Sequence, residues 1–151
     1  RQSAYAHVLS DSRVYTPEVI IDGHGVVEGG DEDDARRMMQ ASAREPKAQV
    51  TLARSAAGVA VDVSAVPAAA GDEGAEVWMA TTESGLTTDV PRGENAGRRL
   101  AHGPIVRSLE RLGAITAPTF HAERALPRHG ERIVVFVQRA KTRRIVGAAT
   151  L

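Results

Sequence analysis

The densest group of side chains that could do chemistry lies in one short stretch in the second half of the chain. Its members are Arg92, Glu94, Asn95, His102 and Arg107. A carboxylate beside a histidine could orient the ring for proton transfer, and Glu94 could instead pair with Arg107. We favour a structural role, in which these groups satisfy loop backbone atoms between glycine turns, because structural ion-pair networks gather the same residue types.

Other kinds of chemistry find little support in the residue types. The 151 residues include no cysteine, so this chain can form neither a disulfide nor a thiolate metal site. No two of its five histidines have the i, i+4 spacing of a helical metal site. The acidic run 31–34 lacks the alternating oxygen ligands of a calcium loop. We therefore expect no metal and no cofactor.

Charge and hydropathy narrow the range of partners. The 19 Lys and Arg residues are balanced by 19 Asp and Glu residues, and the arginine pairs are scattered along the chain, so no basic stripe is predicted for nucleic acid. No apolar run approaches the roughly 20 residues that cross a bilayer. A protein partner and self-association both stay open.

The first 45 residues are predicted to contain two helical stretches and one hairpin. Apolar residues at helical spacing over 4–9 indicate the end of a helix, and β-branched residues on both sides of a glycine turn predict a hairpin over 19–27. Asp31 is placed to cap a second helix, which Pro46 would end.

The remaining residues are predicted to be mostly strands. Apolar residues alternate with period two over 50–63, which predicts a second hairpin, and three further β-rich runs predict an antiparallel β-sandwich. These runs are residues 76–81, 132–138 and 144–149. Trp78, in the first of them, is predicted to anchor the core. Residues 104–112 fit a helix face better than a strand, although both periods are present.

Two stretches carry a family resemblance. VYTPEVIIDG, from Val14 to Gly23, and RGENAGRRLAH, from Arg92 to His102, resemble an uncharacterised family of exported bacterial proteins with a thioredoxin-like domain (domain of unknown function 1223). The resemblance also takes in residues 105–113 and covers essentially the whole chain. In that family a Cys-x-x-Cys segment and a signal peptide precede the region that matches Arg1. The resemblance therefore implies the C-terminal portion of a periplasmic or secreted protein.

The resemblance also sets the expected fold. Combined with the strand pattern, it predicts an α+β chain in which residues 1–45 are the C-terminal portion of a thioredoxin-like domain and residues 46–151 form the β-sandwich. It implies a cis bond between Thr16 and Pro17 that shapes a substrate-binding edge, whereas statistics for X-Pro bonds alone favour trans. It favours a strand over 105–112.

Three functional hypotheses follow. The first is an exported protein that resembles a thiol-disulfide oxidoreductase in full length, although this chain has no redox cysteines. The alternative is a non-catalytic envelope protein that binds a partner. A third, a hydrolase or metal enzyme built on Glu94 and His102, would need a metal or a deep pocket beside them. In each case residues 1–45 are too few to fold alone. Either they dock on the sandwich or on a second chain, or they fray and promote association.

Overall fold

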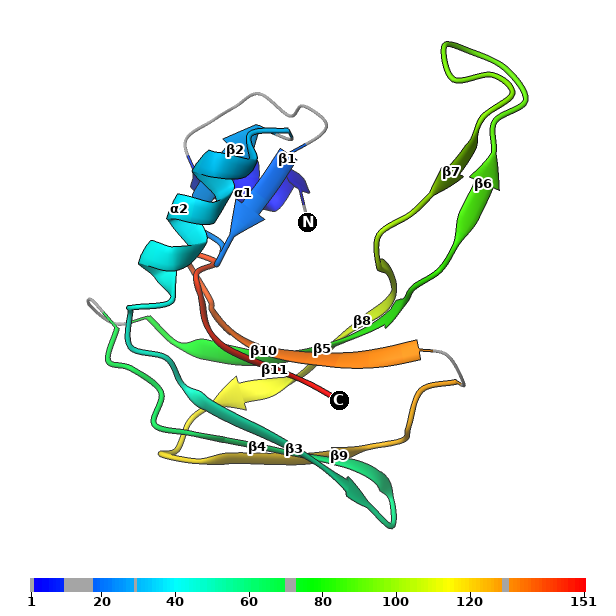
Figure 1. Ribbon diagram of the computed structural model, residues 1–151. Coiled ribbons are helices and arrows are strands. Elements are labelled where there is room, and N and C mark those ends of the chain that lie inside the picture. Colours follow the sequence, from blue (N-terminus) through cyan, green and yellow to red (C-terminus); the bar gives the residue numbers. More distant parts are fainter. Residues whose placement is uncertain (1, 10–17, 29, 70–72, 129–130) are drawn as a thin grey trace.

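The structure is a computed structural model that describes residues 2–9, 18–28, 30–69, 73–128 and 131–151 (Figure 1). Half of the described residues lie in strands and 13% in helices. In chain order the elements are α1 (Gln2–Val8), β1 (Glu18–Ile21), β2 (Gly25–Glu28), α2 (Glu32–Ser42), β3 (Gln49–Ser55), β4 (Gly58–Ser64), β5 (Ala75–Glu83), β6 (Thr87–Asp89), β7 (Arg99–Ala101), β8 (Ile105–Ile115), β9 (Phe120–Arg124), β10 (Glu131–Arg139) and β11 (Ile145–Thr150).

Two antiparallel sheets hold the core between them. One has the order β11-β10-β5-β8 and the other the order β3-β4-β9, and Figure 1 shows the second below the first. Alternate β-branched residues of β4, β5 and β10 fill the space between the sheets. Those with almost no exposed surface include Val59, Val61, Val77, Val135 and Val137. Each fully buried side chain of this kind stabilises the fold by about 1.5–3 kcal/mol.

One edge of the two sheets is joined by a close backbone contact. The Ala48 amide donates a hydrogen bond to the Val146 carbonyl oxygen at 2.6 Å. Gly147 permits this approach, because a Cβ there would lie 2.8 Å from the Ala48 carbonyl oxygen. The sheets do not continue into a closed barrel.

The predicted thioredoxin-like unit over residues 1–45, and with it the predicted α+β fold class, is wrong. Such a unit needs a larger sheet with helices on its faces, but in the described part of this segment β1 pairs only with β2. The other described strands belong to separate antiparallel sheets, so the chain is mostly β. Thr16 and Pro17, the predicted cis pair, lie outside the described residues.

The local predictions for the N-terminal elements are confirmed. A helix and a hairpin stand where the spacing placed them, and Asp31 caps α2 by accepting a hydrogen bond from the Asp34 amide at 2.9 Å. The Met38 side chain of α2 lies against Gly25 at the start of β2. These elements lie on the far side of the four-stranded sheet from β3, β4 and β9 (Figure 1).

The ambiguous segment is a strand, as the resemblance implied. β8 runs beside β5 from Ile105 to Ile115, with irregularities opposite Val77/Trp78 and Thr81/Thr82. Each β-bulge adds a residue and disturbs the alternation, which explains the mixed period in the sequence. Trp78 does not anchor the core: its neighbours Val77 and Met79 point inward, and its indole Nε1 donates to Glu76 Oε2 at 3.2 Å.

Candidate functional site

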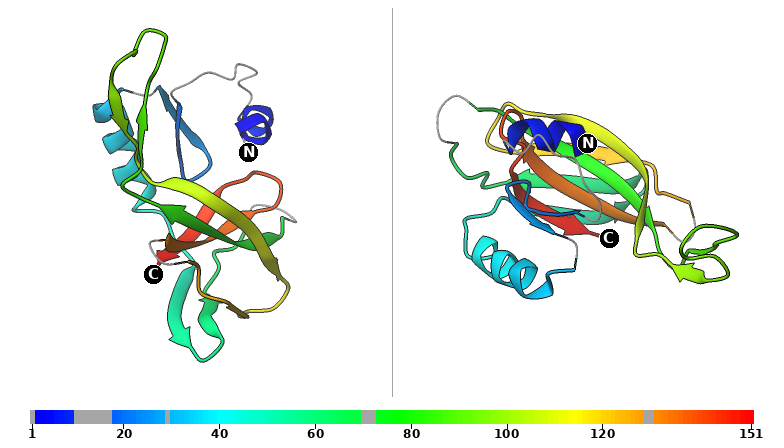
Figure 2. Two further views of the ribbon diagram at one scale, coloured as in Figure 1. Left: turned by 90° about the vertical axis from the view of Figure 1, so that its right-hand side faces the viewer. Right: turned by 90° about the horizontal axis from the view of Figure 1, so that it is seen from above.

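Most of the predicted polar motif lies on a projecting hairpin. Between β5 and β8 the chain leaves the sheet, and β6 pairs with β7 to form what we call the arm, residues 84–104. Figure 1 shows the arm extending away from both large sheets, and Figure 2 shows the same projection from two other sides. Every residue from 91 to 104 is exposed. The motif is therefore presented to solvent.

The five motif residues do not converge. Arg92, Glu94 and Asn95 lie at the tip of the arm, in a turn that the Gly97 amide closes by donating to the Val90 carbonyl oxygen at 2.8 Å. Their side chains form no hydrogen bond or ion pair within the described residues. The other two members contact neighbours outside the motif.

His102 and Arg107 lie further back along the arm and at its root. His102 Nε2 is 2.8 Å from Thr88 Oγ1 on the opposite strand. Arg107 Nε donates to Glu83 Oε2 at 2.7 Å, where the arm joins β5 and β8. No hydrogen bond or ion pair joins any two of the five motif side chains, so this geometry offers no coupled acid and base.

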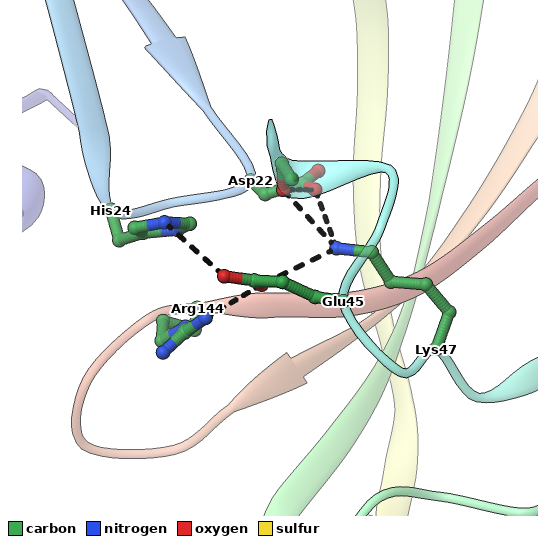
Figure 3. Close-up of polar contacts among 6 residues, drawn as sticks. Asp22, His24, Glu45, Lys47 and Arg144 are labelled. Carbon is green, nitrogen blue, oxygen red and sulfur yellow. Dashed lines mark hydrogen bonds and ion pairs between the residues drawn. The ribbon is translucent and has the colours of Figure 1, made fainter. Parts of the chain in front are cut away.

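A second polar group, which the sequence did not predict, lies where the N-terminal elements meet the large sheet (Figure 3). We call it the junction cluster. Its members come from the β1–β2 turn, the end of α2, the segment before β3 and the approach to β11: they are Asp22, His24, Ser42, Glu45, Lys47 and Arg144.

Asp22 and Glu45 are the two acidic centres of the junction cluster. Asp22 Oδ2 accepts hydrogen bonds from Lys47 Nζ at 2.6 Å and from the Ser42 hydroxyl. Glu45 Oε2 lies 2.7 Å from Arg144 Nη2 and 3.9 Å from Lys47 Nζ, while its Oε1 is 4.0 Å from His24 Nε2. Each carboxylate therefore has a cation beside it.

These contacts alter the acidity of Asp22. Partial burial alone would raise the pKa of its carboxyl group, but hydrogen bonds from Lys47 and Ser42, together with the Lys47 charge, outweigh burial and hold the pKa below its ordinary value. The group is consequently ionised at neutral pH, and its contacts favour the folded state.

Backbone contacts at the same place fix the β1–β2 turn on the sheet. The Ile145 amide donates to the Asp22 carbonyl oxygen at 2.8 Å. Gly23 adopts φ +75°, and any Cβ there would collide with the Arg143 carbonyl oxygen. The junction cluster thus holds the β1–β2 turn and the end of α2 against the large sheet.

The predicted domain boundary at residues 45/46 stays a prediction.

A groove of about 440 Å³ opens beside the junction cluster. Glu45, Lys47 and Arg144 form one part of its lining, and Glu73 and Arg139 another. The Glu73 carboxylate accepts hydrogen bonds from the amides of Lys141 at 2.8 Å and Thr142 at 2.5 Å. Burial alone would raise the Glu73 pKa, but the hydrogen bonds from Thr142 and Lys141 and the Arg139 charge lower it below its ordinary value.

A second hollow, of about 710 Å³, lies at the root of the arm. The Thr81 and Ser108 hydroxyls, 2.8 Å apart, and the Arg107–Glu83 pair form part of its lining. Leu126, 44% exposed, borders it. This hollow gives the base of the arm a surface with both polar and apolar groups.

The described part of the chain shows neither a metal-binding cluster nor a membrane-spanning helix. There, no group of three or more His, Asp or Glu side chains is placed to hold a metal ion. Neither α1 nor α2 has the length and apolar surface of a helix that crosses a bilayer.

Comparison with known proteins places the chain in a family. The model of a protein family of unknown function, DUF1223, matches residues 1–138. The chain belongs to the DUF1223 family. No curated protein and no solved structure matches this DUF1223 chain. The family assignment agrees with the resemblance seen in the sequence and brings no activity with it.

The junction cluster has no short signature by which the sequence could have revealed it. Its residues span positions 22 to 144, and only the folding of the N-terminal hairpin onto the β10–β11 hairpin brings them together. The sequence offers one local indication: opposite charges, Glu45 and Lys47, flank Pro46 in the link between a predicted helix and a predicted strand.

Proposed function

We propose that this DUF1223 chain is a non-catalytic interaction module whose arm binds a partner protein. We also propose that it acts in the periplasm or outside the cell, which rests on the sequence resemblance alone. The observation that carries the binding proposal is the unbroken exposure of residues 91–104. A two-stranded hairpin is marginally stable in water, whereas exposed loops on a rigid scaffold commonly carry binding functions.

The chemistry of the arm suits a protein surface. Arg92 and Arg98 at the tip form no side-chain hydrogen bond or ion pair within the described residues, so their guanidinium groups can bind carboxylates of a partner in a bidentate manner. Leu100 on β7 is 37% exposed and supplies an apolar contact. Arginine is enriched at protein–protein interfaces, and an apolar centre with a polar rim is typical of them.

The competing hypotheses have weaker support. A thiol-disulfide oxidoreductase depended on the thioredoxin-like fold, which the structure contradicts. A hydrolase built on Glu94 and His102 would require those groups to act together, yet His102 contacts Thr88 and Glu94 lies at the tip of the arm.

Site-specific photo-crosslinking in the native host tests the arm proposal. A benzophenone amino acid replaces Glu94 at the tip of the arm, and a matched control replaces Ala57 in the exposed β3–β4 turn. We expect discrete protein adducts from position 94 only, with a lower yield when Arg92 and Arg98 are changed to alanine. No adduct, or the same adducts from both positions, would contradict the proposal.

A further inference from the structure

Arg139, the last residue of β10, is unusual for a charged side chain because it is buried. Only 7% of its surface is exposed, although arginine is rarely buried without a strong partner. Its Nη2 donates a hydrogen bond to the Pro67 carbonyl oxygen. A guanidinium carries five N–H donors, so one such bond leaves most of them unused.

The unused donors of Arg139 face accessible space. Among the described residues that are not exposed, Ser55 Oγ is the one fully buried side-chain polar atom without a partner. Each Arg139 nitrogen that lacks a partner must therefore reach a solvent-accessible surface. Arg139 lines the groove beside the junction cluster, so the groove is the space that these donors can reach.

The acidic groups of the groove are already engaged, but its arginines are not fully used. Glu73 accepts hydrogen bonds from two backbone amides, and Glu45 lies between Arg144 and Lys47. Arg144 uses a single nitrogen on Glu45. The remaining hydrogen-bonding capacity is thus mainly that of guanidinium donors, which match the two oxygens of a carboxylate.

The rest of the lining limits the ligand further. Pro46, Pro67, Ala68, Ala69 and Val146 form apolar walls with short side chains. A volume of about 440 Å³ falls within the range of small-molecule sites. The Lys47 charge is matched by Asp22 at 2.6 Å, which leaves Arg139 and Arg144 as the cations that can bind a ligand. A ligand with a single negative charge suits these arginines, whereas a second negative charge would meet Glu45 and Glu73.

We propose that this groove binds a small monocarboxylate with an apolar body, its carboxylate held by Arg139 and Arg144 and its body lying along the proline and alanine walls. The site is separate from the arm, so it does not depend on the proposed partner binding.

Nuclear magnetic resonance titration of the whole chain tests this site, with hexanoate as the probe and hexanol and inorganic phosphate as controls. We expect hexanoate to shift the amide signals of Lys141 and Thr142 in a saturable way. Hexanol lacks the charge and phosphate lacks the apolar body, so each should bind at least about tenfold more weakly. Equal binding of hexanol would overturn the carboxylate requirement, and equal binding of phosphate would overturn the apolar one.

Variants assign the binding to the arginines. Arg144→Gln should weaken hexanoate binding about tenfold, because it removes a charged donor. Arg139→Lys keeps the buried charge but loses the planar guanidinium that can bind both carboxylate oxygens, so it should also weaken hexanoate binding. Circular dichroism checks that this variant folds. Glu45→Gln should leave binding intact or strengthen it, since it frees Arg144. Arg98→Gln on the arm should have no effect. Unchanged affinity in Arg144→Gln, or no saturable shift with hexanoate, would overturn the proposal.

Discussion

The side-chain amide of Gln138 donates a hydrogen bond to the Tyr5 hydroxyl at 2.7 Å, across 133 positions of sequence. The same nitrogen donates to the Arg143 carbonyl oxygen at 2.7 Å. Gln138 is 1% exposed and Tyr5 8% exposed. This contact fastens α1 to β10, much as the junction cluster fastens the β1–β2 turn. α1 and the β1–β2 turn thus contact the large sheet, which agrees with docking on the sandwich, one of the outcomes that the sequence left open.

Replacing Tyr5 by phenylalanine tests this attachment. The ring stays, but the buried Gln138 amide loses an acceptor, so the free energy of unfolding should fall by about 1 kcal/mol. For a chain of this length the melting temperature should fall by roughly 2–4 °C. Urea denaturation measures the change. Thr88→Val, which removes an exposed hydroxyl from the arm, is the control and should stay within about 0.5 kcal/mol of the parent. Equal effects of the two variants would contradict this role for Tyr5.

Gly23→Ala should be strongly destabilising. Its Cβ would collide with the Arg143 carbonyl oxygen, so the β1–β2 turn would have to move away from the β10–β11 hairpin. Gly97→Ala is a matched control, because Gly97 has a similar φ of +78° but nothing within 4 Å of the added carbon. The control should cost about 1–2 kcal/mol at most, from backbone strain alone. The melting temperature of Gly23→Ala should be well below that of Gly97→Ala. The reverse order would contradict the close approach of Gly23 to the Arg143 carbonyl oxygen.

The stability of the fold should depend on the ionisation of Asp22. Its pKa is lower in the folded chain than its ordinary value, so the unfolded chain takes up the proton first as the pH falls. The stabilisation is complete at pH values above the ordinary carboxyl range, and it is lost as the pH falls through that range and on through the lower pKa of the folded chain. Asp22→Asn should therefore be less stable at neutral pH and should lose less stability over this interval.

Urea unfolding at a series of pH values measures this dependence. Asp89→Asn on the arm is the control, since Asp89 lies 3.9 Å from Arg99 and is highly exposed. It should keep the pH dependence of the parent chain. If the unfolding free energy of Asp22→Asn depended on pH as steeply as that of the parent chain, the pKa of Asp22 would not change on folding.

His102→Ala should have little effect on global stability. The sequence alone suggests a cost of about 1 kcal/mol for a lost polar contact. The structure lowers that expectation, because the His102–Thr88 contact is exposed and lies on the arm, so the change should stay within about 0.5 kcal/mol. Calorimetry measures the loss. A cost above 1 kcal/mol would mean that the arm unfolds together with the two large sheets.

The strands that the sequence predicted best are those with one buried face. Val59, Val61 and Val63 alternate with polar or small residues, and the structure buries all three. In contrast, β6 and β7 are exposed on both faces, so no apolar period marks them. β9, from Phe120 to Arg124, is short and only half-buried on its inner side, and the sequence did not indicate it.

The errors in how the elements are arranged in space had a different cause. The β1–β2 hairpin and the two helices were predicted correctly, but a correct helix or strand assignment does not determine which sheet the element packs on. The thioredoxin-like fold was predicted from the family resemblance and not from these elements. Trp78 was expected inside because it is large, yet its position between Val77 and Met79 places it on the opposite face of β5. The junction cluster depends on tertiary contacts, which no local spacing encodes.

The attachment of the arm has a mechanical consequence. The arm leaves the sheet at Glu83, the end of β5, and returns at Ile105, the start of β8, and these two residues are paired with each other. A pull on the tip therefore reaches the ends of both strands at the same place in the sheet. β5 is paired with β10 from Ala75 to Glu83, and antiparallel hydrogen bonds run perpendicular to the strands. The component of such a load that runs along β5 is shared by all the hydrogen bonds of the β5–β10 ladder and does not open them pair by pair. We therefore expect the sheet to resist tension that is applied through the arm in this direction.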